Sequence, residues 1–219
     1  MCYYIVVRGD FTLRLRNLKN KEIILSESDY VIENPFLYRG RFCDLFGNFN
    51  PIHLEIGMGK GKFLYQNALL HPDINFIGIE KCDNVLARAL LFLPKDIPNL
   101  KIIRIHALEI DKIFDKEISV LYLNFSDPWP KVRQNKRRLT STIFLEKYEN
   151  IFVNTKTIHF KTDNYDLYRY SIESLSQYGY SFYDVTFDLH REFDSIIMTE
   201  YEEKFVKKGQ KIYALKARK

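Results

Sequence analysis

The chain has 219 residues and a formal net charge of +5, with 46% hydrophobic and 28% charged residues. This balance is typical of an ordinary globular protein, and no apolar run approaches the roughly 18 residues of a membrane span. The three cysteines lack the paired spacing of a disulfide framework or a zinc site. We therefore expect a cytoplasmic protein without a metal site, whose excess positive charge favours an anionic partner.

The order of apolar runs predicts an arm followed by one domain. Residues 1–35 show no clear period and are expected to form a partly flexible N-terminal arm, whereas residues 36–219 form a single domain. Short apolar runs predict strands at 52–57, 75–80, 100–106, 120–126 and 157–163. Helical patterns lie between and after these strands, at 60–71, 83–93, 109–114, 139–150 and 165–178. Two more apolar runs, 180–189 and 211–217, flank a helical segment at 199–208.

The alternation of strands and helices indicates a Rossmann-like α/β fold. Short, almost continuously apolar strands are typical of a parallel sheet covered by helices on both faces. The last two strands lack an intervening classical crossover, which favours an antiparallel hairpin at one edge. We therefore expect a mostly parallel sheet of seven strands.

A glycine-rich turn follows the first expected strand. In "LEIGMGKGKFL", Gly57, Gly59 and Gly61 lie between a strand and a helix, where a ligand can approach the backbone and the helix amides. Glu80 ends the next strand about 20 residues later, where a carboxylate can accept hydrogen bonds from ribose hydroxyls. Together they favour an adenosine-bearing cofactor, although many such turns are glycine-rich for packing alone.

The residue Glu55 narrows the choice of cofactor. A carboxylate inside the turn would repel a pyrophosphate, and the pattern GxGxG differs from the GxGxxG of dinucleotide sites. Phe63 after Lys62 also excludes a Walker A loop. An acid at this place suits a cationic or amino-bearing ligand such as the methionyl end of S-adenosylmethionine.

Polar residues end all of the first five expected strands. These residues are Glu55, Glu80, His106, Asp127 and Asp163. The ligand crevice of an open α/β sheet lies outside the carboxyl ends of its strands. The five side chains are therefore expected to converge on one site.

The stretch "SDPWPKVRQNKRR" combines a stiff loop with a basic run. Pro128 and Pro130 fix the backbone around Trp129, which either fills the core or forms a wall of a nucleobase pocket. The basic run is either a solvated face or a clamp for nucleic-acid phosphates; it contains Lys131, Arg133, Lys136, Arg137 and Arg138.

Five stretches of the chain resemble the bacterial tRNA (guanine-N7)-methyltransferase family. They are "HLEIGMGKGKF", "FIGIE", "NFSDPWPKVRQNKRRL", "HFKTDN" and "TEYEEKF", and the resemblance runs from about Asn34 to the C-terminus. It implies a class I methyltransferase fold, S-adenosylmethionine as donor, and tRNA as partner. The implied substrate atom is N7 of the guanine at position 46, in the variable loop.

The resemblance also implies roles for individual residues. Asp127 matches the catalytic position. The cofactor-binding positions are Glu55, Gly57, Gly59, Gly61, Glu80, His106, Ala107 and Asp127. The substrate-binding positions are Lys131, Asp163, Thr199, Glu200, Tyr201 and Glu202, and the RNA-contacting positions are Arg133, Lys136, Arg137 and Arg138. His106 departs from the family, which usually has an acid at this place to read the adenine amine.

Two other functions remain open at this point. An amino-group methyltransferase carries an Asn or Asp followed by prolines and an aromatic residue, which "SDPW" partly matches. A tRNA-binding protein without activity is the second alternative. No obligatory protein partner is implied, and the chain is expected to be a monomer or a homodimer. Residues 1–12 either belong to the arm or precede a true start at Leu13.

Overall fold

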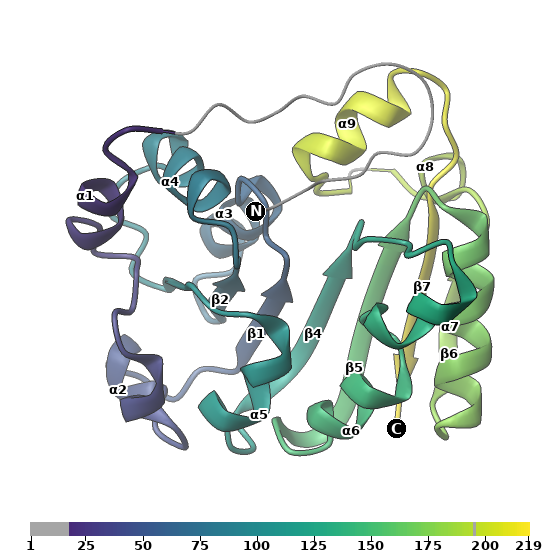
Figure 1. Cartoon of the computed structure of the whole chain (residues 1–219), viewed down its shortest axis with the longest axis horizontal. Helices are drawn as coiled ribbons and strands as arrows, with labels where there is room; N and C mark the ends of the chain where they lie inside the picture. Colours follow the sequence, from purple (N-terminus) through teal and green to yellow (C-terminus); the bar gives the residue numbers. More distant parts are fainter. Residues whose placement is uncertain (1–17, 195) are drawn as a thin grey trace.

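The computed structural model describes residues 18–194 and 196–219, so the alternative start at Leu13 lies outside the described residues. Its centre is a seven-stranded sheet with the strand order β3-β2-β1-β4-β5-β7-β6 (Figure 1). The strands are β1 (Ile52–Ile56), β2 (Asn75–Ile79), β3 (Leu100–Ile103), β4 (Ile118–Asn124), β5 (Phe152–Thr162), β6 (Ser181–Thr186) and β7 (Tyr213–Arg218).

The directions of the strands confirm the expected sheet. Neighbouring strands from β3 to β5 are parallel, whereas β7 runs antiparallel to both β5 and β6. Because β1 to β5 all point the same way, their carboxyl ends lie along one edge of the sheet. The polar residues that follow them are thereby brought to the same side of the molecule.

Helices connect the strands in the order that the sequence indicates. They are α1 (Lys21–Ser26), α2 (Cys43–Phe46), α3 (Lys62–Leu70), α4 (Asp83–Phe92), α5 (Ile110–Ile113), α6 (Thr142–Tyr148), α7 (Tyr165–Gln177), α8 (Leu189–Glu192) and α9 (Glu200–Val206). Three 3₁₀ helices add η1 (Pro35–Tyr38), η2 (Ala107–Glu109) and η3 (Val132–Arg137). No helix within the described ranges is long and apolar enough to cross a membrane.

The sheet separates two apolar cores, one on each of its faces. One contains Leu64 of α3, Leu86 of α4 and Leu25 of α1, and the other contains Ile113 of α5, Leu145 of α6 and Leu175 of α7. Figure 1 shows α5 and α6 in front of the sheet and α3 behind it. The expected helices on both faces are thus confirmed.

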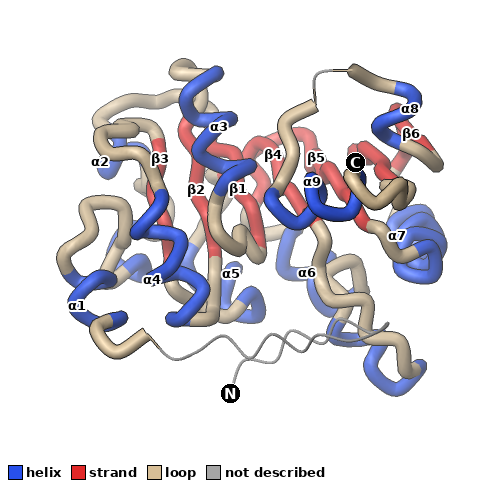
Figure 2. Tube along the Cα trace, turned by 90° about the horizontal axis from the view of Figure 1, so that it is seen from above, coloured by secondary structure: helices blue, strands red, loops and turns tan. Residues whose placement is uncertain are grey.

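Helix α9 lies over the carboxyl edge of the sheet. Figure 1 shows it above the arrowheads of β4 and β5, and Figure 2 shows the same crossing from above. An ion pair joins Lys60, in the turn after β1, to Glu200 with 3.7 Å between Nζ and Oε1. A second pairs Lys62 of α3 with Glu203. Helix α9 therefore lies beside the turn that leads into α3.

Some elements differ from the sequence expectation. Residues 18–35, expected as part of the arm, contain α1, whose Leu25 is buried, and a parallel bridge between Val31 and Ile102. Helix α1 has only 6 residues, which is too short for a helical period to be visible. Strand β5 begins at Phe152, five residues earlier than expected, and this start was missed because residues 153–155 are exposed and mostly polar. The basic run also forms η3 directly after the second proline.

Gly78 of β2 allows the glycine-rich turn and α3 to approach the sheet. A Cβ added there would lie 2.6 Å from Leu64 Cδ2 and closer still to Met58 Sδ. Met58 belongs to the turn, and the amides of Gly57 and Met58 both donate to the Ile79 carbonyl. The lack of a side chain at Gly78 thus helps to set the height of the turn above β2.

We predict that Gly78→Ala destabilises the protein by about 1–3 kcal/mol, the usual cost of overpacking a core. The measurement is the urea midpoint of unfolding. The double variant Gly78→Ala/Met58→Ala, compared with Met58→Ala alone, should show a smaller loss because one of the two crowded neighbours is removed. An unchanged midpoint in the single variant would contradict this account of the packing.

Candidate active site

The glycine-rich turn leaves open space above the end of β1. The φ values of Gly57, Gly59 and Gly61 are +80°, +58° and +80°, which residues other than glycine rarely adopt. Apart from each glycine and its two chain neighbours, no residue has an atom within 4 Å of the point where a Cβ of Gly57 or Gly59 would be. Gly61 is the N-cap of α3. The turn can therefore receive a ligand against its backbone.

Glu55 is a buried carboxylate with one oxygen that has no hydrogen-bond partner. It is 1% exposed, and its Oε1 accepts a hydrogen bond of 2.8 Å from Asn124 Nδ2 on the neighbouring β4. Its Oε2 is buried and has no hydrogen-bond partner. Burial raises the pKa of Glu55 to about 7, against the opposing effects of the Asn124 hydrogen bond and the Lys161 charge. An ammonium group would satisfy the open oxygen and favour the ionised carboxylate.

Glu80 is held in one orientation by backbone amides. Its Oε1 accepts from Cys82 N at 2.9 Å and its Oε2 accepts from Gly59 N at 3.3 Å. These contacts fix the carboxylate directly after β2, which is the position where the sequence predicts a ribose-binding acid.

Asp127 lies in a strained loop just beyond β4. Phe125 and Trp129 on either side have φ values of +52° and +44°, which are unusual for residues other than glycine. Asp127 is half-buried, and burial raises its pKa while the charge of Lys81 opposes the rise. The unusual backbone conformation of the loop places Asp127 at the carboxyl edge of the sheet, where Glu55 and Glu80 also lie.

Asp163 follows β5 and is connected to the C-terminal part of the chain. Its Oδ2 accepts from the Tyr201 hydroxyl and from Gln210 Nε2, each at 3.2 Å. The ring of Tyr201 lies 5.2 Å from that of Phe125 in the Asp127 loop. Two of the expected substrate-binding residues thus contact each other beside that loop.

The residues of the segment Thr199–Glu202 do not all face the site. Thr199 and Glu202 form a capping box at the start of α9. Glu202 is fully buried, and its two oxygens contact Lys161 Nζ at 2.7 Å and His190 Nε2 at 2.9 Å. The side chain of Glu202, expected to bind substrate, is therefore occupied by internal contacts that fix α9 above β5.

His106 has its acceptor nitrogen occupied. Nδ1 of the exposed ring accepts from Leu108 N at 3.1 Å and caps η2, which begins at Ala107. In a neutral imidazole with Nδ1 as acceptor, Nε2 carries the proton and donates. His106 therefore cannot replace the acid that reads an adenine amine without breaking this cap.

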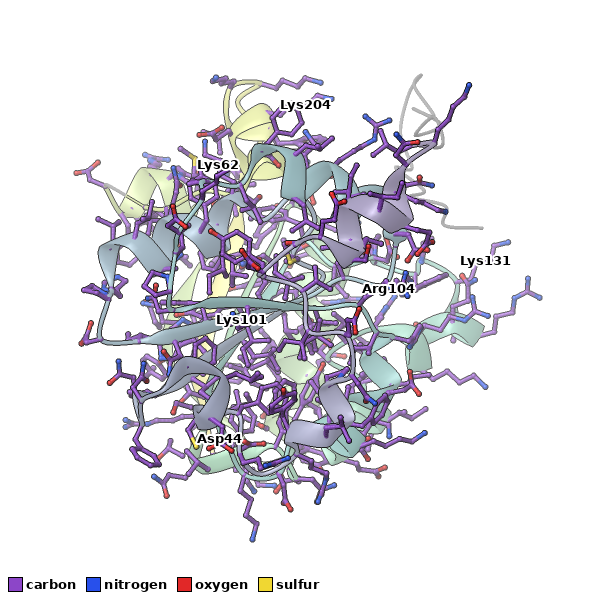
Figure 3. The ribbon with its side chains drawn as sticks, turned by 90° about the vertical axis from the view of Figure 1, so that its left-hand side faces the viewer. Asp44, Lys62, Lys101, Arg104, Lys131 and Lys204 are labelled. Carbon is purple, nitrogen blue, oxygen red and sulfur yellow. The ribbon has the colours of Figure 1, made fainter. Side chains whose placement is uncertain are left out.

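The basic run divides into exposed and buried members. Four cations are exposed, namely Lys131, Arg133, Lys136 and Arg137, and Figure 3 shows Lys131 extending from the periphery of the molecule. Arg138, in contrast, is 7% exposed. Its guanidinium donates to the carbonyls of Pro128 and Trp129 at 2.9 and 3.1 Å.

Trp129 belongs to neither apolar core. Its ring is half-buried and lies under the Arg137 guanidinium, with 4.9 Å between the guanidinium carbon and the ring centroid. The alternative that Trp129 fills the core is therefore wrong. A wall of a base pocket remains the prediction for this side chain.

Sequence reasoning missed two residues of the site. Asn124 orients Glu55, and Lys161 neutralises Glu202 while its Nζ lies 5.0 Å from the centroid of the Phe63 ring. Each is a buried polar residue at the carboxyl end of its strand, directly after an apolar residue, which is the signal that could have identified it. Both also line a cavity of about 420 Å³ beside the site, between the sheet and the segment after α8.

Comparisons with known proteins agree with this geometry. A family model described as "Putative methyltransferase" matches residues 49–215. Similar solved structures include the 16S rRNA methyltransferase KamB, with a TM-score of 0.62 and 13% identity over 82% of this chain and 92% of that chain. An antibiotic-related methyltransferase has a TM-score of 0.61 and 16% identity over the same shares. At these identities the likeness shows the fold, which is that of the class I methyltransferases.

The sequence relatives are closer. A tRNA (guanine-N(7)-)-methyltransferase of Bacillus cytotoxicus is 50% identical over 194 residues, which cover 87% of this chain and 89% of that protein. Proteins of the same name from a Geobacillus species and from Streptococcus equi subsp. zooepidemicus are 49% and 46% identical over 92% and 94% of this chain, and over 93% and 99% of their own lengths. The chain therefore belongs to the tRNA (guanine-N7)-methyltransferase family.

We predict that Glu55→Gln makes the protein more stable, relative to the original, as the pH rises. The raised pKa favours the protonated carboxyl in the fold, so this contribution to stability is full below about pH 4.5 and is lost as the pH rises through about 7. The difference is on the order of 3 kcal/mol. Urea midpoints of both proteins at several pH values provide the measurement.

The control for this prediction is Glu173→Gln, which removes a carboxylate from an exposed position of α7. It should show no comparable gain with pH. Parallel stability curves for Glu55→Gln and the original protein would contradict the assignment of a raised pKa to Glu55.

Proposed function

We propose that the protein transfers a methyl group from S-adenosylmethionine to N7 of the guanine at position 46 in the variable loop of tRNA. The observation that supports this best is the buried Glu55, whose open oxygen lies at the edge of the sheet that also carries the glycine turn and Asp127. The names of the sequence relatives favour the same reaction. A homologous fold described with the cosubstrate S-adenosylmethionine supports the choice of donor.

The residues present fit that donor. Glu55 would bind its amino group, and Glu80 would accept hydrogen bonds from the ribose hydroxyls. The open backbone at Gly57 and Gly59 gives room for the methionyl part. When bound, the donor supplies a methyl group on a cationic sulfur.

The chemistry requires orientation more than a base. Guanine N7 has a free lone pair, so no proton must leave before it attacks the methyl carbon. The product is the cationic 7-methylguanine. The Asp127 carboxylate would stabilise the developing positive charge or accept hydrogen bonds from guanine N1–H and the amino group. Asp163, held by Tyr201, would help to position the base.

The exposed cations beside Asp127 suit an RNA backbone. Lys131, Arg133, Lys136 and Arg137 extend the loop and can contact phosphates around the target base. We propose a cytoplasmic enzyme that acts on tRNA as a monomer or a homodimer and requires no other protein.

The test is methyl transfer to unmodified tRNA with nucleoside mapping. We predict 7-methylguanosine at position 46, and none in a tRNA whose guanine 46 is replaced by adenine. An N-methylated amino group in the products would instead favour the amino-group methyltransferase. Tight tRNA binding with no methyl transfer would favour the non-catalytic alternative.

We predict that Asp127→Asn lowers kcat about 100-fold, the usual range for loss of one electrostatic contact to the transition state. Because the amide keeps the shape of the side chain, the change in tRNA affinity should be much smaller. Single-turnover rates with saturating S-adenosylmethionine measure the effect. A near-normal rate would rule out charge stabilisation by Asp127.

A further inference from the structure

The loop that carries Asp127 holds strain that something must balance. Among the described residues, four other than glycine have positive φ, and two of them, Phe125 and Trp129, flank Asp127. Such conformations cost on the order of 1–3 kcal/mol each and persist only where the surroundings enforce them. Pro128 and Pro130 also lack N–H groups, so they cannot anchor the loop as hydrogen-bond donors.

Arg138 anchors the loop through two of its carbonyl groups instead. Its Nε donates to the Pro128 carbonyl at 2.9 Å and its Nη2 donates to the Trp129 carbonyl at 3.1 Å. These are charge-assisted hydrogen bonds to consecutive carbonyls, which match the fork geometry of a guanidinium. They lie on the two residues that directly follow Asp127.

The other side of Arg138 rests on α7. The guanidinium carbon lies 4.3 Å from the centroid of the Tyr170 ring. Two residues further along the chain, Thr140 Oγ1 and Ser171 Oγ share a hydrogen bond of 2.8 Å, and Ser174 Oγ donates to the Thr140 carbonyl at 2.7 Å. Arg138 thus connects the strained loop to a helix that is packed in the core.

The remaining cations of the loop differ from Arg138 in exposure. Arg133 and Arg137 are exposed, whereas Arg138 is 7% exposed, with its planar face covered by Tyr170. A phosphate can reach the first two without any rearrangement. To reach Arg138 it would have to displace two carbonyl acceptors and an aromatic ring.

We propose that Arg138 is a positioning residue that clamps the Asp127–Trp129 segment against α7, and that it does not bind tRNA phosphates. This role rests on the proposed methyl transfer, since the clamp fixes the carboxylate that faces the target base. It replaces the RNA-contacting role expected for Arg138 from the sequence. Loss of the clamp should misplace Asp127 without changing the charge that tRNA meets.

The experiment compares Arg138→Gln and Arg138→Lys with Arg133→Gln, which removes the same charge from an exposed position of the same loop. We expect Arg138→Gln to lower kcat about 10- to 100-fold at saturating tRNA, the scale of a misplaced catalytic group. Its slope of log affinity for tRNA against log salt should stay unchanged. Arg133→Gln should raise KM and lower that slope by about 0.9 at most.

A second readout is independent of activity. Trp129 is the only tryptophan of the chain, so its fluorescence reports on the clamped loop alone. We expect acrylamide to quench Trp129 more strongly in Arg138→Gln than in the original protein or in Arg133→Gln, with tRNA absent. Arg138→Lys, which keeps the charge but not the fork, should also show increased quenching.

Two results would overturn the clamp. One is a lowered salt slope in Arg138→Gln together with unchanged quenching of Trp129, which would return Arg138 to the phosphate contacts. The other is normal kcat and unchanged quenching in both Arg138 variants. If Arg138→Gln does not fold, as judged by circular dichroism, the folded Arg138→Lys decides by the same two readouts. If the original protein methylates no tRNA, the quenching comparison still decides.

Discussion

The site depends on one constraint of the sheet, which is the shared direction of strands β1 to β5. Parallel strands place their carboxyl ends along one edge, and each connection from that edge must leave through a loop. Four different strand ends carry the acidic residues Glu55, Glu80, Asp127 and Asp163. These residues are distant in sequence, and the sheet places them along the same edge. The apolar side chains of the same strands pack against the helices on both faces, which stabilises the sheet. Fold and site are thus two results of one arrangement.

Negative and positive side chains at this edge differ in burial. The carboxylates of Glu55 and Glu80 lie inside, where backbone amides and Asn124 orient them. The cations of the 131–137 segment lie outside, where solvent lowers the cost of their charge. The cationic cofactor and the RNA that we propose would therefore meet opposite charges on the two sides of the Asp127 loop. Lys161 and Glu202 form an internal ion pair and neutralise each other, so they add no net charge to either side.

Most of the fold followed from the sequence because its signals are local. Apolar strands, the glycine turn and the proline loop each act within a few residues, so the succession of strands and helices along the chain could be predicted. What could not be predicted depends on contacts between distant segments. Leu25 packs under α4 only because the sheet brings it there, and Glu202 meets Lys161 across 41 positions of the chain. The polar start of β5 was missed for the same reason, since Phe152 pairs with Ile118 of β4.

The segment "NKRR" shows where residue identity stops being sufficient. Arg137 and Arg138 are the same amino acid at neighbouring positions, and a basic run alone gives both the same role. At the end of η3 the chain turns, so that Arg137 covers the outer face of Trp129 while Arg138 points under the loop to its carbonyls. The two guanidinium groups then have different partners, since Arg137 is exposed over the Trp129 ring and Arg138 donates to the carbonyls of Pro128 and Trp129. A loop made rigid by prolines needs an outside donor for its carbonyls, and a buried arginine next to an exposed one is a simple way for a basic run to provide it.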